Sequence, residues 1–143
     1  MHITATELRS LSQNILAAHG FSQEHQHSIT ETLVTAQIDQ CHSHGVWRLL
    51  GIIDTLKHGK INATASPVVT HEQGAIIKID AKLGAATTAL ALGLPKLIEK
   101  AKQSGIALLA INHCVHFSAL WVEIEQLTRA GLIAINMTPS HAW

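Results

Sequence analysis

Along the N-terminal part of the chain, apolar residues recur every three to four positions, which is the period of a helix buried on one side. Thr4 and Glu7 have the spacing of a capping box, and Gly20 ends the first run. Ser22 is suited to cap a second helix, and Gly59 ends a third run. The inner positions of the three runs are Leu8, Leu11, Ile15 and Ala18, then Ile29, Leu33 and Ala36, then Val46, Leu49, Leu50, Ile53 and Leu56. The pattern therefore predicts three helices.

The pattern changes after a polar connector at residues 59–67. Short apolar runs at 68–69 and 76–79 flank the turn sequence HEQG, which predicts a hairpin of two short strands. Residues 84–104 are rich in alanine and leucine and predict a helix that Gly105 ends. Pro95 lacks a backbone N–H and clashes with the preceding turn, so we expect a kink or break near Gly93.

The last part of the chain alternates between strand and helix patterns. Residues 106–112 and 132–137 have the continuous apolar pattern of buried strands, and residues 119–130 between them predict a helix that Gly131 ends. The strand at 132–137 would have no later partner, and an apolar sheet edge of this kind promotes aggregation. We therefore expect that the chain is part of a longer fold or relies on another chain.

These elements predict an α/β (α+β) protein with two parts. Residues 1–66 form a helical segment, and residues 67–143 form the start of a mixed-sheet α/β domain. With 47% hydrophobic and 14% charged residues, the chain has enough apolar material for a core.

Charge and hydropathy exclude several classes of protein. Ten basic and ten acidic residues balance, and no Lys/Arg run is present, which argues against a nucleic acid partner. The apolar stretches are far shorter than the roughly 20 residues of a membrane helix, and the N-terminus has no signal pattern, so we expect a cytoplasmic protein. Cys41 and Cys114 are expected to be free thiols rather than a disulfide.

Candidate chemistry is concentrated in the sequence CHSHGVWR at residues 41–48. It places the hydroxyl of Ser43, the imidazole of His44 and the guanidinium of Arg48 at a predicted helix start, where backbone N–H groups favour an anion. If the helix already includes His44, its side chain and that of Arg48 lie on one face, one turn apart. Such a set can hold a carboxylate and move a proton.

Each of these residues also has a purely structural interpretation. The Ser-His-Gly turn can be a helix cap, and Arg48 can lie along the helix surface. A zinc site is another hypothesis, because two turns are rich in cysteine and histidine, although their spacing fits no common zinc module. The candidate zinc ligands are Cys41, His42, His44, His113, Cys114 and His116.

The segments QIDQCHSHGVWRLL, INATASP, AKQSGIALLAIN and NHCVHFSALW together resemble the malate/L-lactate dehydrogenase type of NAD(P)H-dependent oxidoreductase. Within that family, HCVHFSALW and TPSHAW are similar to the Δ1-piperideine-2-carboxylate/Δ1-pyrroline-2-carboxylate reductases. The resemblance implies a non-Rossmann NAD(P)-binding fold, in agreement with the absence of a GxGxxG loop. Members are usually more than twice as long, which implies an N-terminal fragment.

The resemblance also implies roles for individual residues. Ser43 and His44 correspond to the proton-relay pair, and Arg48 to the residue that binds the substrate carboxylate. The cofactor contact, NADPH or alternatively NADH, falls on His116, Phe117, Ser118, Ala119 and Leu120. The acidic residue that completes the relay in the family lies beyond residue 143, and homodimers are usual.

Three functions stay open at this point. The first is reduction of cyclic imino acids, and the second is oxidation of a 2-hydroxy acid such as malate or lactate, since Arg48 suits the carboxylate of either substrate. The third is a non-enzymatic remnant or a subunit whose apolar edge pairs with another chain. No metal is expected in the first two.

Overall fold

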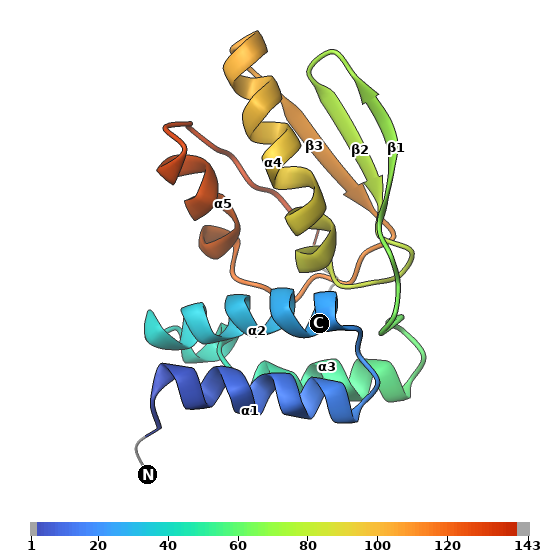
Figure 1. The fold of residues 1–143 in the computed structure, drawn as a ribbon, viewed down its shortest axis with the longest axis vertical. Helices are drawn as coiled ribbons and strands as arrows, with labels where there is room; N and C mark the ends of the chain where they lie inside the picture. The colour runs from blue at the N-terminus through green and yellow to red at the C-terminus, as the bar shows by residue number, and fades with distance from the viewer. Residues whose placement is uncertain (1–2, 140–143) are drawn as a thin grey trace.

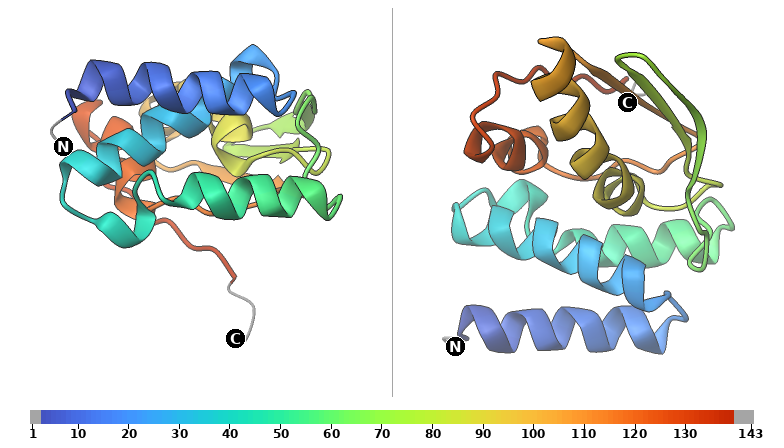
Figure 2. Two further views of the ribbon diagram at one scale, coloured as in Figure 1. Left: turned by 90° about the horizontal axis from the view of Figure 1, so that it is seen from below. Right: turned by 45° about the horizontal axis from the view of Figure 1, so that its top comes forward.

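The computed structural model describes residues 3–139 and contains five α-helices and three strands within them. Helices α1 (Ala5–Ala18), α2 (Gln23–Ile38) and α3 (Arg48–Lys57) lie together at one end of the molecule (Figure 1). In Figure 1, α1 and α3 lie below α2, which faces the remaining elements, and in the left view of Figure 2 α2 crosses between α1 and α3. The three predicted helices are confirmed.

The predicted caps of the first two helices are present. Thr4 accepts a hydrogen bond from the N–H of Glu7, whose carboxylate in turn accepts one from the N–H of Thr4. The hydroxyl of Ser22 accepts from the N–H of His25 at 3.4 Å. These caps fix where the helices begin, and their apolar faces then meet in a first core. That core contains Leu16, Phe21, Ile29, Leu33, Leu49, Ile52, Ile61 and Ala85.

The predicted hairpin is confirmed and is part of a mixed sheet. Strand β1 (Val68–Gln73) pairs antiparallel with β2 (Ile76–Asp80), and β2 pairs parallel with β3 (Leu108–Asn112). The turn is tighter than HEQG suggested, because His71, Glu72 and Gln73 already belong to β1 and Gly74 turns the chain at a φ of 55°. Only glycine adopts such a φ at no steric cost.

Helix α4 (Ala86–Ser104) packs against the sheet and runs through Pro95 without interruption, so the predicted break is wrong. One lost backbone hydrogen bond is tolerated because the helix is held against β2 and β3 on either side of the proline. Gly93 makes the closest approach: a Cβ there would lie 2.7 Å from Leu109 and 2.9 Å from Ile79. A second core forms at this contact from Ile77, Ile79, Ala81 and Ala89.

Two predictions for the last part of the chain need correction. Strand β3 is not the buried strand that was predicted: it lies at an edge of the three-stranded sheet within the described residues, and Leu108 is 56% exposed. Residues 132–139 are not a strand but an extended segment after α5 (Leu120–Arg129), since no described strand lies beside them to supply hydrogen bonds. Ile133, Ile135 and Met137 on this segment are 100%, 85% and 84% exposed.

The observed fold is mixed α/β with a helical N-terminal part, as predicted. The boundary at residues 66 and 67 stays a prediction, as does the assignment of the second part to cofactor binding. Cys41 and Cys114 are both free thiols. No helix within residues 3–139 is long and apolar enough to cross a bilayer.

His25 joins the two parts of the molecule. Its imidazole is fully buried, with Nδ1 2.9 Å from the Ser22 hydroxyl, and its Nε2 accepts the backbone N–H of Ala85 at 3.3 Å. Ala85 is the N-cap of α4, so His25 satisfies a backbone donor at the start of that helix. Burial lowers the pKa of His25 below its usual 6.5, although the nearby Glu24 carboxylate opposes the shift.

This burial predicts that acid destabilises the protein through His25. Below pH 6.5 the unfolded chain binds a proton at this histidine and the folded chain does not. The free energy of unfolding therefore decreases as the pH is lowered, until the pH reaches the lowered pKa of the folded state. His25→Leu should remove this dependence and cost about 1–3 kcal/mol at pH 8, because the Ala85 N–H loses its acceptor. Urea unfolding between pH 5 and 8 measures both effects, with the exposed neighbour His27→Leu as the control. Equal pH dependence in the wild type and His25→Leu would contradict the assignment.

Candidate active site

Ser43 and His44 lie in a 3-10 turn, η1 (His42–His44), and not at the helix N-terminus that the sequence suggested. Helix α3 begins at Arg48, and its N-cap is Trp47. Helix α3 does not include His44, so the condition under which His44 and Arg48 would share one helix face is not met. The turn still holds the pair together, because the Ser43 hydroxyl lies 3.0 Å from Nδ1 of His44. The thiol of Cys41 is 3.7 Å from the same nitrogen.

Arg48 folds back over this turn. Its Nε donates to the carbonyl oxygen of Ser43 at 2.8 Å, and its guanidinium lies 5.5 Å from the ring centre of Trp47. These contacts fix the plane of the guanidinium and leave its two terminal nitrogens to bind a carboxylate. A fixed, planar pair of donors is the arrangement that binds a carboxylate through both oxygens.

The first turn of α5 reaches the same place from the other part of the molecule. Trp121 meets the ring of His44 edge to face at 6.3 Å, and its indole N–H donates to Asp39 at 3.0 Å. His44 has a pKa below the usual 6.5, because it is partly buried and because the positive charges of Arg48 and His116 act on it. The structure thus brings the two predicted site segments together.

The five residues predicted to contact a cofactor have different surroundings. His116 lines a groove, with 20% of its side chain exposed. Phe117 packs against the first core, whereas Ser118 and Ala119 are buried and Leu120 is the first residue of α5. Of the five, His116 has the side chain best placed to touch a bound molecule, and the role of all five stays a prediction.

Glu123 in the first turn of α5 is the centre of a hydrogen-bond cluster. Its Oε1 lies 2.7 Å from Nε2 of His116 and also accepts from the Ser118 hydroxyl. Its Oε2 accepts from the amide of Asn136 on the extended segment. Burial alone would raise the pKa of Glu123, but the hydrogen bonds from His116 and Ser118 outweigh it and leave that pKa below the usual 4.5.

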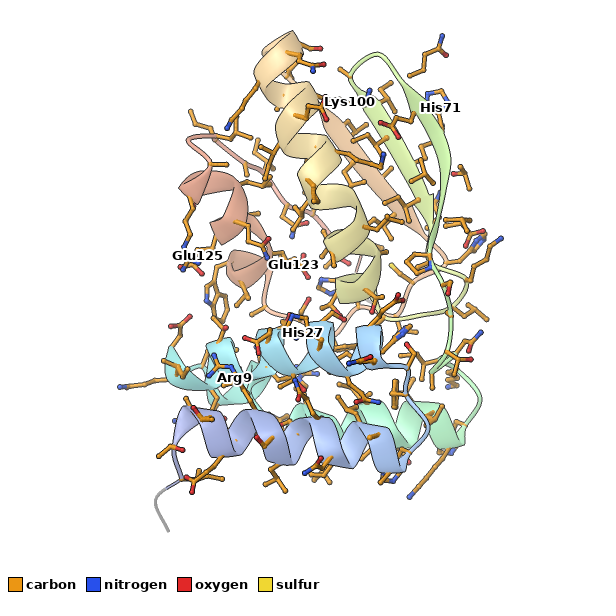
Figure 3. The ribbon with its side chains drawn as sticks, viewed as in Figure 1. Arg9, His27, His71, Lys100, Glu123 and Glu125 are labelled. Carbon is orange, nitrogen blue, oxygen red and sulfur yellow. The ribbon has the colours of Figure 1, made fainter. Side chains whose placement is uncertain are left out.

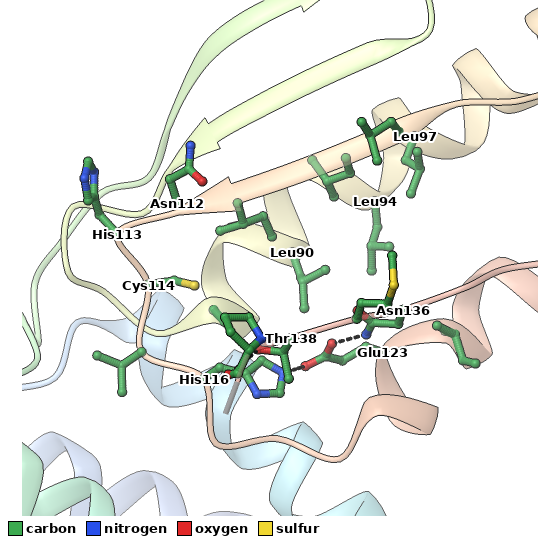
Figure 4. A pocket seen from close by; sticks show the side chains of 18 of the residues that line it. Leu90, Leu94, Leu97, Asn112, His113, Cys114, His116, Glu123, Asn136 and Thr138 are labelled. Atoms are coloured by element: carbon green, nitrogen blue, oxygen red, sulfur yellow. Dashed lines mark hydrogen bonds and ion pairs between the residues drawn. The ribbon is translucent and has the colours of Figure 1, made fainter. Parts of the chain in front are cut away.

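The groove beside this cluster has a volume of about 710 Å³ and lies between α4, β3, α5 and the extended segment. Figure 4 shows His116, Glu123 and Asn136 at one end of it and the leucines of α4 along its wall. One end of the groove is therefore polar and charged, and the other end is apolar. Such a combination is typical of sites for small molecules and cofactors.

The zinc hypothesis fails for the part of the chain that the structure describes. No group of three or more His, Cys, Asp or Glu side chains within residues 3–139 is arranged to hold a metal ion. Cys41 instead contacts Ser43 and His44, while His113 pairs with Asp80 at 3.3 Å. The Cys/His-rich turns at residues 41–44 and 113–116 thus make separate contacts and do not combine into one metal site within the described residues.

Sequence reasoning missed Glu123, Asn136, Trp121 and Asp39. A signal for Glu123 was available, because Leu120, Ile124 and Leu127 form the apolar stripe of α5 and Glu123 sits on the same face. An acidic residue within such a stripe is expected to have a partner. The contacts of Asp39 and Asn136 link positions far apart along the chain and have no local pattern.

Known proteins match the chain along nearly its whole length. The sequence profile described as malate/L-lactate dehydrogenase matches residues 3–143. The chain belongs to this family. It is 50% identical over 143 residues, 100% of its length, to a Δ1-pyrroline-2-carboxylate/Δ1-piperideine-2-carboxylate reductase of Pseudomonas aeruginosa, of which it covers 43%. It is 43% identical over 141 residues, 99% of its length, to Δ1-pyrroline-2-carboxylate reductase 1 of Burkholderia ambifaria, of which it covers 42%.

A solved structure has the same fold. The crystal structure of Δ1-piperideine-2-carboxylate reductase from Pseudomonas syringae pv. tomato superposes with a TM-score of 0.88 at 36% identity. The superposition covers 92% of this chain and 40% of that one. The family resemblance drawn from the sequence is confirmed, and the chain spans about two fifths of the length of these relatives.

The cluster of positive charges predicts how His44 titrates. Replacing Arg48 by glutamine removes one of the two charges that lower the pKa of His44, so this pKa should rise toward 6.5. The ring carbon resonances of His44, followed by NMR against pH, measure the change. Arg9→Gln on α1, whose arginine pairs with Glu31, is the control and should leave His44 unchanged. A lower pKa of His44 in Arg48→Gln would show that the charges do not act as described.

Proposed function

We propose that this chain is the substrate-binding and first cofactor-binding portion of an NADPH-dependent reductase of cyclic imino acids. Such an enzyme converts Δ1-piperideine-2-carboxylate to pipecolate and Δ1-pyrroline-2-carboxylate to proline. The observation that carries the proposal is 50% identity along the whole chain to a reductase of this substrate pair. The convergence of Ser43, His44 and Arg48 with the loop of His116 supports it.

Arg48 is suited to the carboxylate that both imino acids carry. Because its Nε is already bound to Ser43, the guanidinium presents only its terminal nitrogens, which match the two oxygens of a carboxylate. Binding at this end fixes the ring of the substrate and directs its carbon–nitrogen double bond toward His44 or His116. Fixed orientation of this kind contributes a large share of an enzymatic rate enhancement.

His44 is suited to move the proton that the reduced nitrogen requires. The Ser43 hydroxyl is bound to Nδ1 and orients the ring, which leaves Nε2 for the substrate. Its lowered pKa keeps the imidazole largely neutral at pH 7, so that it gives up a proton readily once it has received one. Ser43 and His44 thus act as a unit in this proposal.

The groove beside His116 suits a nicotinamide cofactor. The family is NAD(P)-dependent, and we assign NADPH here, with NADH as the alternative. The polar end of the groove offers the side chains of His116 and Asn136. When bound, the cofactor supplies the hydride that the imine carbon receives.

The exposed apolar residues of the extended segment argue that another part of the protein or another chain covers it. Ile133, Ile135 and Met137 lie in water on residues 132–139, which is unfavourable for a stable surface. We propose that this face is covered either by the remaining length that the relatives possess or by a second copy, as in a homodimer. A chain that serves only as a structural subunit would use the same face and would have no need for the Arg48 and His44 geometry.

The proposal predicts turnover of imino acids. NADPH oxidation is followed at 340 nm with Δ1-piperideine-2-carboxylate, Δ1-pyrroline-2-carboxylate and, as the 2-oxo acid control, pyruvate. His44→Ala should lower the rate by about 10²–10⁴-fold through loss of proton transfer. Arg48→Met should lower kcat/KM by about 10–100-fold through loss of a charged hydrogen bond.

The matched control is Arg9→Met, which removes an arginine of α1 that pairs with Glu31 and makes no hydrogen bond or ion pair with Ser43, His44 or Arg48 in the described part of the chain. Both the 143-residue chain and the same chain fused to the remaining length of a relative are assayed. Faster reduction of pyruvate than of either imino acid by the fused protein would contradict the substrate assignment.

A further inference from the structure

Glu123 is a carboxylate in an unusual position. Its side chain is only 5% exposed, whereas Glu125, two residues further along α5, is 43% exposed and pairs with Arg129 at 2.8 Å. In Figure 3 Glu123 points toward the interior and Glu125 away from it. Burial of a carboxylate is costly unless donors surround it. Glu123 has three donors, from His116, Ser118 and Asn136.

The cluster determines where the proton of His116 lies. An ionised carboxylate can only accept, so the proton shared between Oε1 of Glu123 and Nε2 of His116 belongs to the imidazole. The other ring nitrogen, Nδ1, has no hydrogen-bond partner within residues 3–139. In its neutral form His116 therefore presents a lone pair at Nδ1 and not at Nε2, and in its protonated form it presents an N–H at Nδ1 in the same direction.

Two further contacts keep this arrangement in place. The Ser118 hydroxyl bonds the same carboxylate oxygen and lies 3.2 Å from Nε2 of His116, so the loop is fixed on both sides of Phe117. Asn136 holds the second oxygen and ties the extended segment to α5. The position of Glu123 in the first turn of α5 also stabilises its negative charge through the helix dipole.

We propose that Glu123 is a positioning residue of the active site, which holds His116 in one orientation and one tautomer so that Nδ1 faces the bound cofactor or substrate. The inference rests on the proposed function for the identity of the bound molecule. The pairing of Glu123 with His116 does not depend on it. Glu123 acts through His116, and it touches neither reactant.

The pairing is tested by NMR on the 143-residue chain. A proton on Nε2 that is held by a buried carboxylate exchanges slowly with water and gives a resolved imidazole N–H signal, which His116→Asn assigns. Glu123→Leu removes the acceptor, and the signal should disappear. Glu123→Gln retains the volume and an acceptor oxygen, and reorientation of the Asn136 amide satisfies its new donor, so the signal should survive at a shifted position.

Glu125→Gln is the matched control, because it removes a carboxylate from the same helix without touching His116. It should leave the signal unchanged. Thermal unfolding followed by circular dichroism identifies any variant that fails to fold. If Glu123→Leu does not fold, the signal of Glu123→Gln alone tests the pairing of Glu123 with His116. An imidazole N–H signal that is the same in wild type and Glu123→Gln, or in wild type and folded Glu123→Leu, would overturn the pairing.

The role of Nδ1 is tested by adding NADPH to the same samples. The ¹⁵N shift of Nδ1 in His116 should move with saturation in the wild type, and Glu123→Gln should bind NADPH about 10-fold more weakly, as expected when a hydrogen bond to a charged group is weakened. If NADPH shifts the signals of Arg48 or Trp121 but does not change the ¹⁵N shift of His116 Nδ1, the proposed role of Nδ1 is overturned. If NADPH shifts no signal in the 143-residue chain, the chain does not bind cofactor by itself, and the same titration of the fused full-length protein decides the role of Nδ1.

Discussion

The fold depends on a junction at Gly84 and Ala85, where three segments meet that are far apart in the sequence. The N–H of Ala85 donates to the buried His25 of α2, and the backbones of Gly84 and Ala86 exchange hydrogen bonds with Val115, each at 2.9 Å. A Cβ on Gly84 would lie 2.9 Å from Ala65, from the carbonyl of Ala81 and from His25, so only glycine fits. The junction thereby connects the loop of His116 to the helical part of the molecule, in which the turn η1 carries His44.

The site is built from side chains with constrained partners. A carbonyl oxygen holds Arg48, and a hydroxyl holds His44. Carboxylates hold the other two side chains: Asp39 holds Trp121, and Glu123 holds His116. For Arg48, His44 and His116, each contact uses one polar atom and leaves another available to a ligand, whereas the single N–H of the Trp121 indole is already donated to Asp39. The positive charges of Arg48 and His116 lower the pKa of His44, so a bound carboxylate would in turn act on the titration of all three residues.

The sequence predicted the parts of this structure that depend on local patterns. Helices α1 and α2 and the hairpin follow from capping residues, apolar spacing and the turn at Gly74. The motif at residues 41–48 located Ser43, His44 and Arg48, although the break in helical geometry before α3 was not foreseen. That break arises because η1 ends at Gly45, whose backbone is extended with a ψ of −158°.

Other features depend on contacts that no local pattern contains. Residues 132–137 have the composition of a strand but lack a neighbouring strand within the described residues, so composition alone gave the wrong element. His25 lies on a helix where an exposed position is the ordinary expectation, and its burial follows from the meeting of α2 with the start of α4. Glu123 is distinguished by partners on a preceding loop and a following segment.

The central claim is that residues 41–48 and 113–123, which come from different parts of the molecule, form one ligand site. Hydrogen–deuterium exchange of the 143-residue chain and of its fusion to the remaining length of a relative, with and without NADPH, tests it directly. In the fused protein, the account predicts that NADPH slows exchange in both segments together and leaves α1 unchanged. Protection of only one of the two segments would contradict the account.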